Sequence, residues 1–209
     1  GLTGTKESIR SGMGEIAVAK YTYDAYLALE KEENIKYEFH DGMITAMAGG
    51  TPNHALISMN VGSSLNNELR SSNSSCNVYS SDLKVRVDAT NRTYYPDVSV
   101  VCEKPQTSQK DSNAITNPVL IVEVLSESTA GFDRGAKFAH YREIPSLKQY
   151  VLVSQTEAMV DTFYRVNDNT WEIETLVGLD SDVELKALGI TVKMADIYRQ
   201  IEFSETTSP

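Results

Sequence analysis

Apolar residues recur along the chain with two different spacings, and the change from one to the other predicts a mixed succession of helices and strands. Helical spacing marks the stretches 23–33, 52–70, 131–143 and 194–201. Thr22 supplies an N-cap for the first helix, and Pro52 suits the first turn of the second. The inward stripe of that second helix is expected to be Leu56, Ile57, Val61, Leu65 and Leu69.

Shorter blocks with strand character fill most of the remaining chain. Two hairpins are expected, 36–47 and 158–177, and the first turns at Asp41-Gly42, a pair that supplies the positive φ of a tight turn. Further strands are expected over 77–80, 82–88, 97–102, 119–125 and 147–154. The polar segment 103–117 is predicted to be a flexible loop.

This order of elements favours one domain of mixed α/β class, in which helices flank a central mixed β-sheet. With 209 residues, 41% of them hydrophobic, the chain can bury a sizeable core. Segment 119–125 is apolar on both faces apart from Glu123, as expected of a central strand. We expect the domain to cover 21–203, with an N-terminal extension over 1–20 and a frayed tail over 204–209.

Charge and cysteine content narrow the classes of function. A net charge of −10 counts against a protein that coats nucleic acid, although a local basic groove and an acidic cation site can coexist with it. No apolar run approaches the roughly 20 residues that cross a bilayer, and no signal-peptide layout is present, so no membrane partner is expected. Cys76 and Cys102 lack metal-type spacing, which predicts reduced thiols and a cytoplasmic location.

Two carboxylates stand at the ends of predicted strands. Asp97 heads one apolar run, and Glu123 lies near the tail of the next. Burying Glu123 costs several kcal/mol unless it is paired or binds a cation, so a structural salt bridge and a functional role are both open. Glu38 adds a third acid within a strand-like segment. Together these acids favour Mg²⁺, which typically takes one or two carboxylates plus water and phosphate oxygens.

The helix expected after Glu123 supplies a lysine. Asp133, Lys137 and Tyr141 are spaced so that they share one helix face. An ordinary Asp–Lys helix pair is one interpretation of this spacing. The other is that Lys137 faces the acids and brings a fixed positive charge to a metal site.

These pieces occur in a recognisable order along the chain. They are Tyr37-Glu38-x-x-Asp41-Gly42, His54, the segment 82–87, Tyr95-Pro96-Asp97-Val98, Val122-Glu123-Val-Leu-Ser126 and Asp133-x-x-x-Lys137-x-x-x-Tyr141. The set resembles the Uma-two family of restriction-type endonucleases, within the PD-(D/E)XK nuclease superfamily, across residues 21–203.

The resemblance implies a restriction-endonuclease-like core and Mg²⁺, with Mn²⁺ as a substitute, held by Asp97 and Glu123. Glu38 would be an accessory acid. The superfamily pattern has a lysine two residues after the second acid, where this chain has Leu125. The resemblance therefore assigns the lysine role to Lys137.

Other polar residues are candidates for the surroundings of this site. Asp82 is expected to brace the site or bind metal, and His54 either faces the core or starts a helix, or else is an accessory residue of the site. Lys84 is a rival lysine on the strand 82–88, where its alternation with apolar residues predicts one wet face. Arg86 and Arg134 are candidates for phosphate contacts, with a solvated surface position as the other interpretation.

The leading functional hypothesis is a Mg²⁺-dependent endodeoxyribonuclease with Asp97, Glu123, Lys137 and Glu38 as catalytic residues. A homodimer is expected, because two strands must be cut with one site per chain. The alternative is a catalytically weak or inactive nuclease fold that acts as a binding or assembly module, favoured by the acidic charge and by Leu125. Hydrolysis of another phosphate-containing substrate would use the same residues.

Overall fold

The strands form two six-stranded sheets and two two-stranded ribbons in this computed structural model, which describes residues 7–8 and 19–204. The first sheet, here called the central sheet, has the order β14-β13-β12-β11-β8-β5. Its strands are β5 Asn77–Tyr79, β8 Val98–Val101, β11 Leu120–Val124, β12 Gln149–Val153, β13 Met159–Asn167 and β14 Thr170–Val177.

The second sheet, here called the outer sheet, has the order β4-β3-β7-β6-β10-β9. Its strands are β3 Tyr37–His40, β4 Met43–Ala46, β6 Lys84–Val87, β7 Arg92–Tyr94, β9 Thr107–Ser108 and β10 Asp111–Ile115. The ribbons pair β1 Glu7–Ser8 with β2 Ala19–Lys20 and β15 Asp182–Leu185 with β16 Ile190–Lys193.

The helices begin close to where the sequence predicts. They are α1 Tyr23–Glu33, α2 Pro52–Ser71, α3 Ala130–Arg134, α4 Ala136–Tyr141 and α5 Met194–Ile197, with a 3-10 turn at Asp88–Thr90. Thr22 and Thr51 cap α1 and α2, because each side-chain oxygen accepts a bond from a backbone N–H three residues on. The single helix expected over 131–143 is instead broken at Gly135, where φ is −102° and ψ is −92°.

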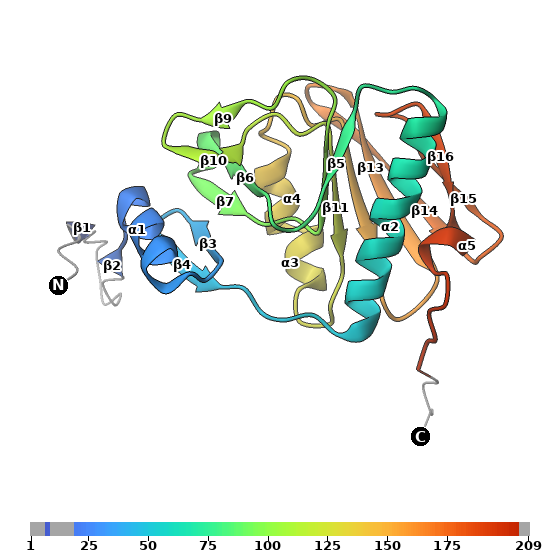
Figure 1. The fold of residues 1–209 in the computed structure, drawn as a ribbon, viewed down its shortest axis with the longest axis horizontal. Coiled ribbons are helices and arrows are strands. Elements are labelled where there is room, and N and C mark those ends of the chain that lie inside the picture. Colours follow the sequence, from blue (N-terminus) through green and yellow to red (C-terminus); the bar gives the residue numbers. More distant parts are fainter. Residues whose placement is uncertain (1–6, 9–18, 205–209) are drawn as a thin grey trace.

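The central sheet separates two hydrophobic cores. Figure 1 shows α2 along one of its faces and α3, α4 and the outer sheet on the other. Ile57, Val61, Leu65 and Leu69 of α2 are buried against the central sheet, as predicted, whereas Leu56 lies off this stripe and is 39% exposed. The mixed α/β prediction is confirmed, since β11 pairs parallel with β12 and antiparallel with β8. The outer sheet was not expected.

Segment 103–117 is not the flexible loop that its composition predicts. It contains β9 and β10, and β10 pairs parallel with β6. Asp111 is buried and accepts a bond of 2.9 Å from the hydroxyl of Tyr23. Ser108 and Asp111 are therefore buried although most polar residues of the segment are exposed, which composition alone does not indicate. The strands β7, β15 and β16 are also absent from the sequence prediction.

The wet face expected for β6 is wrong, because Lys84 and Arg86 are both buried. The Lys84 ammonium lies 2.9 Å from Glu30 Oε1 and 2.6 Å from Asp111 Oδ2. The Arg86 guanidinium stacks 4.1 Å from the centre of the Tyr23 ring. It also donates to the side chains of Asp88, Asn91 and Thr93. Both cations are thus satisfied inside the protein.

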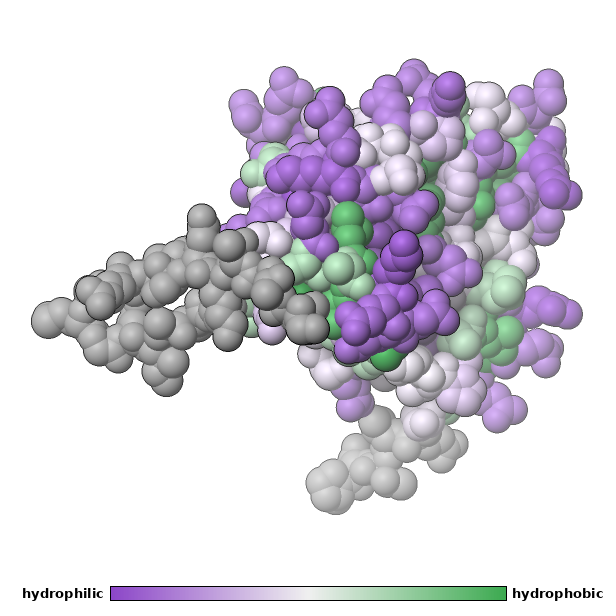
Figure 2. Space-filling view, turned by 60° about the vertical axis from the view of Figure 1, so that its left-hand side comes forward, coloured by the Kyte–Doolittle hydropathy of each residue, from purple (hydrophilic) through white to green (hydrophobic). Residues whose placement is uncertain are grey.

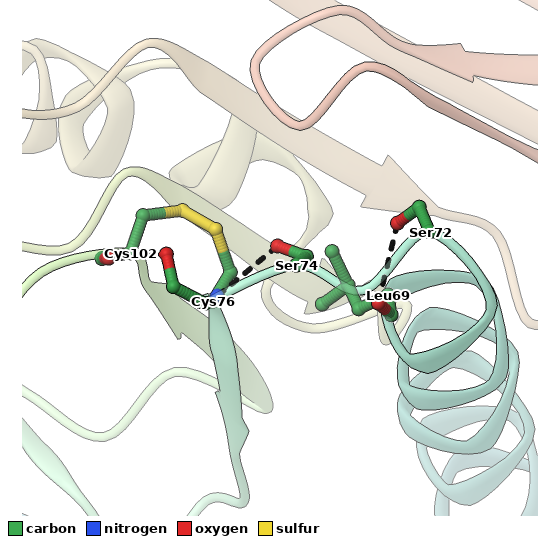
Figure 3. Close-up of a disulfide and its surroundings, with 6 residues drawn as sticks. Leu69, Ser72, Ser74, Cys76 and Cys102 are labelled. Atoms are coloured by element: carbon green, nitrogen blue, oxygen red, sulfur yellow. Dashed lines mark hydrogen bonds between the residues drawn. A yellow bond between two sulfur atoms is a disulfide. The ribbon is translucent and has the colours of Figure 1, made fainter.

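Cys76 and Cys102 form a disulfide, so the prediction of reduced thiols is wrong. Figure 3 shows the bond at the end of the β5–β8 pair, with the Ser74 hydroxyl accepting a bond from the Cys76 N–H. Asn77 pairs with Val101 in this ladder, so the next two residues outward are the cysteines. Their separation of 26 residues along the chain conceals this adjacency.

Hydrophilic residues cover most of the face drawn in Figure 2, with hydrophobic residues gathered in smaller patches. Within the part of the chain that the structure describes, no helix combines the length and hydropathy needed to cross a membrane. The expected N-terminal extension, 1–20, and tail, 204–209, fall largely outside the described residues.

Candidate active site

The register between β8 and β11 sets two acids opposite each other. Val100, Ser99 and Val98 pair with Leu120, Ile121 and Val122. One residue further, the same register sets Asp97 opposite Glu123. Opposed residues of an antiparallel pair point to the same face of the sheet, with Cβ atoms about 5 Å apart. Asp97 also ends the ladder, because its Oδ2 accepts a bond of 2.7 Å from the Val124 N–H.

Lys137 reaches Glu123 from α4. Its Nζ lies 3.0 Å from Glu123 Oε1 and 3.6 Å from Asp133 Oδ1, and all three side chains are buried. Tyr141 donates its hydroxyl to the same Glu123 oxygen at 3.1 Å. The predicted helix face is therefore present across the break at Gly135, and it is turned toward the acid on β11.

The electrostatics of this cluster centre on one cation among several acids. Burial raises the pKa of Glu123 well above its usual range, Lys137 opposes this rise, and Asp97 and Asp133 add to it. Burial alone would lower the pKa of Lys137, but Glu123, Glu38 and Asp133 together raise it above its ordinary value. Lys137 is thus held as a cation, and an added positive charge would be favourable beside it.

Glu38 joins the cluster from β3. Its Oε2 accepts a bond of 3.4 Å from the Tyr95 N–H, and His40 Nε2 lies 4.0 Å from its Oε1. Burial raises the pKa of Glu38, the Lys137 charge lowers it, and Asp133 and Asp97 raise it again. The accessory acid predicted from sequence therefore lies within electrostatic range of the other site residues.

His54 lies at the site rather than in the core. Its Nε2 is 3.3 Å from Asp97 Oδ1, and this contact raises the pKa of the imidazole against the effect of burial. The ring fits because residue 50 is glycine. A Cβ at Gly50 would come within 2.8 Å of His54 Nδ1.

Four of the other candidates are placed elsewhere. Asp82 is exposed and pairs with Lys36. Lys84 and Arg86 lie in the buried network of the outer sheet described above. Arg134 pairs with the buried Asp161. These charges are already matched, so the structure does not bring them to the acids.

Sequence reasoning missed the aromatic lining of the site. The Lys137 ammonium lies 5.1 Å from the centre of the Tyr94 ring and 5.8 Å from that of Tyr141. Such contacts stabilise a desolvated cation. The Tyr94-Tyr95 pair directly before Pro96-Asp97 is a signal in the sequence that could have indicated this aromatic lining.

The residues fit a two-carboxylate cation site. Carboxylate oxygens are hard ligands of the kind that Mg²⁺ prefers, and one or two of them suffice when water and phosphate complete the shell. Lys137 and Tyr141 both contact Glu123 Oε1, and no described residue hydrogen-bonds its Oε2. Across 7–8 and 19–204, no group of three or more His, Cys, Asp and Glu side chains is arranged to hold a metal.

A cleft of about 600 Å³ opens beside Asp97. It lies between α2 and β5, and Asp97, His54 and Tyr95 form part of its lining. Figure 1 shows these two elements beside each other at the edge of the central sheet. The cleft gives Asp97 access to a ligand.

A family model described as "Putative restriction endonuclease", Uma2, matches residues 23–195. The chain belongs to this family. Its resemblance to Uma-two proteins is thereby confirmed, and membership in Uma2 supports a nuclease role.

Two relatives come from Synechocystis sp. (strain ATCC 27184 / PCC 6803 / Kazusa). "Uncharacterized protein slr1290" is 38% identical over 184 residues, which cover 88% of this Uma2 chain and 94% of the relative. "Uncharacterized protein sll1609" is 34% identical over 165 residues, which cover 79% of this chain and 92% of the relative.

A solved structure has the same fold. It is the crystal structure of "a putative nuclease belonging to DUF820 from Anabaena variabilis ATCC 29413", with a TM-score of 0.67 and 16% identity. The match covers 85% of this chain and 97% of that one. The Uma2 chain therefore shares its architecture with a solved protein across most of both lengths.

Proposed function

We propose that the protein is a Mg²⁺-dependent endonuclease that hydrolyses phosphodiester bonds of DNA. The observation that carries the proposal is the register that sets Asp97 opposite Glu123, with the Lys137 ammonium 3.0 Å from Glu123. Membership in a family described as "Putative restriction endonuclease" supports it, as does the fold shared with a structure described as "a putative nuclease".

Asp97 and Glu123 are the proposed ligands of Mg²⁺, with Mn²⁺ as a substitute. When bound, such an ion polarises the phosphate and lowers the pKa of bound water. The two acids come from adjacent strands of the central sheet, so they are held on a rigid frame.

Lys137 is the proposed electrostatic catalyst. Its ammonium is oriented by Glu123 and Asp133, and a fixed cation in a buried site stabilises negative charge that develops on a phosphate. Glu38 is the proposed accessory acid, which would support a ligand or a second ion from β3. Its backbone partner, the Tyr95 N–H, fixes its direction.

The test is plasmid nicking in Mg²⁺ or Mn²⁺. Asp97→Asn and Glu123→Gln keep the shape of each side chain and remove its charge. Both are expected to lose at least about 100-fold in rate, the scale expected when a group that stabilises the transition state is removed. Asp168→Asn is the matched control, since Asp168 is an exposed acid in the turn between β13 and β14, at the opposite edge of the central sheet from β8 and β5. Equal nicking by Asp97→Asn and the unchanged protein would refute the proposal.

A binding or assembly module is the second candidate. The observation that favours it is the pairing of Lys137 with two acids, together with Leu125 at the usual lysine position. Mn²⁺ separates the two candidates. A melting temperature that rises with Mn²⁺, and does not rise in Glu123→Gln, favours the nuclease, because a ligand that binds the folded state stabilises it.

We also propose that the nuclease acts as a homodimer in the cytoplasm. A dimer supplies one site for each strand of a duplex, and sedimentation velocity measures it directly. The cytoplasmic location rests on DNA as the substrate. The Cys76–Cys102 disulfide removes the support that reduced thiols would have given, since such bonds persist mainly in oxidising surroundings.

A further inference from the structure

We infer that the cleft between α2 and β5 takes an unpaired DNA strand. This inference rests on the proposed nuclease function and specifies the form in which DNA enters the cleft, as a strand separated from its partner strand. It starts from the position of Asp97 and His54 in the lining of the cleft, where a bound strand would bring a phosphate to Asp97.

One wall of the cleft is a face of α2. Ser58, Gly62 and Asn66 succeed one another at intervals of four residues along this wall, and Met59 and Ser63 lie beside them. Because most of these side chains are small, they occupy little of the space between α2 and β5, and all of them are uncharged. Met59 is an exception in size, and it is 68% exposed.

The opposite wall comes from β5 and the residues that follow it. Val78 supplies apolar surface, and Ser80 and Ser81 supply hydroxyl groups, while Tyr79 borders the cleft and packs against the core on the other face of the sheet. The Met59 thioether on one side and the apolar Val78 on the other suit the flat faces of unpaired bases. Serine and asparagine groups suit base edges, which are free for hydrogen bonding only when a strand is unpaired.

Charge argues against a duplex in this cleft. Duplex DNA carries about one negative charge per 1.7 Å, and its binding depends on many neutralising cations. Lys36 is the only Lys or Arg in the described lining of the cleft, and it is already paired with Asp82. Binding here must therefore come mainly from base contacts.

The size of the cleft also favours an unpaired strand over a duplex. Its volume of about 600 Å³ lies within the range of about 300–1,000 Å³ that small ligands fill. A short run of nucleotides is of this scale, whereas a duplex is far wider than such a cleft.

Gly62→Phe tests the inference. A Cβ at Gly62 meets nothing within 4 Å, so the helix accommodates the new side chain, which would extend into the cleft. Phenylalanine is also a better helix former than glycine, so loss of the fold is not expected. Asn67→Phe is the control, because Asn67 is exposed on the same helix and lies outside the lining.

The probe is a fluorescein-labelled oligo-dT, followed by fluorescence anisotropy in EDTA so that no cleavage occurs. The unchanged protein is expected to bind it more tightly than the oligo-dT·oligo-dA duplex. Gly62→Phe is expected to weaken binding of the single strand about tenfold, the loss of one stacked base, while Asn67→Phe leaves it unchanged.

Tighter binding of the duplex, no binding of the single strand, or equal binding by Gly62→Phe would each overturn the inference. Its failure is distinguishable from failure of the proposed function. Plasmid nicking that depends on Asp97 but not on residue 62 would support the proposed nuclease function and refute the inference about the cleft. Single-strand binding that is sensitive to residue 62, without any nicking, would support the inference about the cleft and refute the proposed nuclease function.

Discussion

Lys137 of α4 and Glu123 of β11 form a buried ion pair, with Nζ 3.0 Å from Oε1. A buried pair adds little net stability, but removing one partner leaves the other charge uncompensated. The same two residues therefore affect both the proposed chemistry and the stability of the core between the central sheet and α4. Variants of the two residues can separate these roles.

Lys137→Met is expected to lower the free energy of unfolding by about 3 kcal/mol, because Glu123 stays buried without its cation. Urea denaturation measures the change. Adding Glu123→Gln removes the stranded charge, so the double variant should recover most of the lost stability. It should not recover nicking activity. A double variant that is no more stable than Lys137→Met would contradict the assignment.

Gly50→Ala is expected to displace the His54 ring from Asp97, since the new Cβ would lie 2.8 Å from Nδ1. We expect a drop of about tenfold or more in nicking rate, because small misplacements of supporting groups are costly in an active site. Weaker binding of Mn²⁺ by calorimetry should accompany it. Gly49→Ala is the matched control, since a Cβ there meets nothing within 4 Å. Equal effects at the two glycines would argue against a positioning role for His54.

Reduction of the Cys76–Cys102 bond is expected to lower stability by about 3 kcal/mol, the loop-closure value for its separation of 26 residues. The midpoint of urea unfolding should fall when dithiothreitol is added. A Cys76→Ser, Cys102→Ser double variant should match the reduced protein and show no response to dithiothreitol. A response that persists in this variant would mean that reduction acts elsewhere.

His140 is expected to make stability fall as the solution becomes acidic. Burial lowers the pKa of its imidazole, Arg92 lowers it further, and Glu143 and Asp41 oppose this. The unfolded chain therefore binds a proton first, so this contribution is complete above about pH 6.5 and is lost as the pH falls through the folded pKa. Urea titrations between pH 7.5 and 5 should show a shallower loss for His140→Asn. His40 and His54 remain in both proteins, and because the His140 charge lowers the pKa of His40, the difference reports His140 together with this coupling. An unchanged dependence of the free energy of unfolding on pH in His140→Asn would exclude His140 as a source of this loss.

The parts of the fold that depend on local pattern were predictable from sequence. The periodicity of 52–70 and the Asp-Gly turn at Asp41 act within a few residues, and α2 and the β3–β4 hairpin lie where they predict. The face that joins Lys137 to Glu123 was also visible as spacing along one helix. Neither the break at Gly135 nor the inclusion of His54 in the site follows from spacing.

The parts that depend on distant partners were not predictable. The sequence pattern predicts Lys84 at the surface, but in the structure it is paired with Glu30 of α1 and Asp111 of β10. Segment 103–117 is predicted as a loop because most of its residues are polar, and its strand character depends on the pairing of β10 with β6. Cys76 and Cys102 are neighbours through strand pairing alone. In each case the deciding contact lies far away along the chain.

The pairing of β8 with β11 also determines where this chain can tolerate changes of length. Successive residues of a strand face opposite sides, so a deletion of one residue within Val98–Val101 would break the register that sets Asp97 opposite Glu123. An insertion in the exposed turn at Gln109 and Lys110, between β9 and β10, lies outside these ladders and leaves the two acids opposed. Homologues and engineered forms should therefore vary in length at such a turn and keep the length of β8 itself constant.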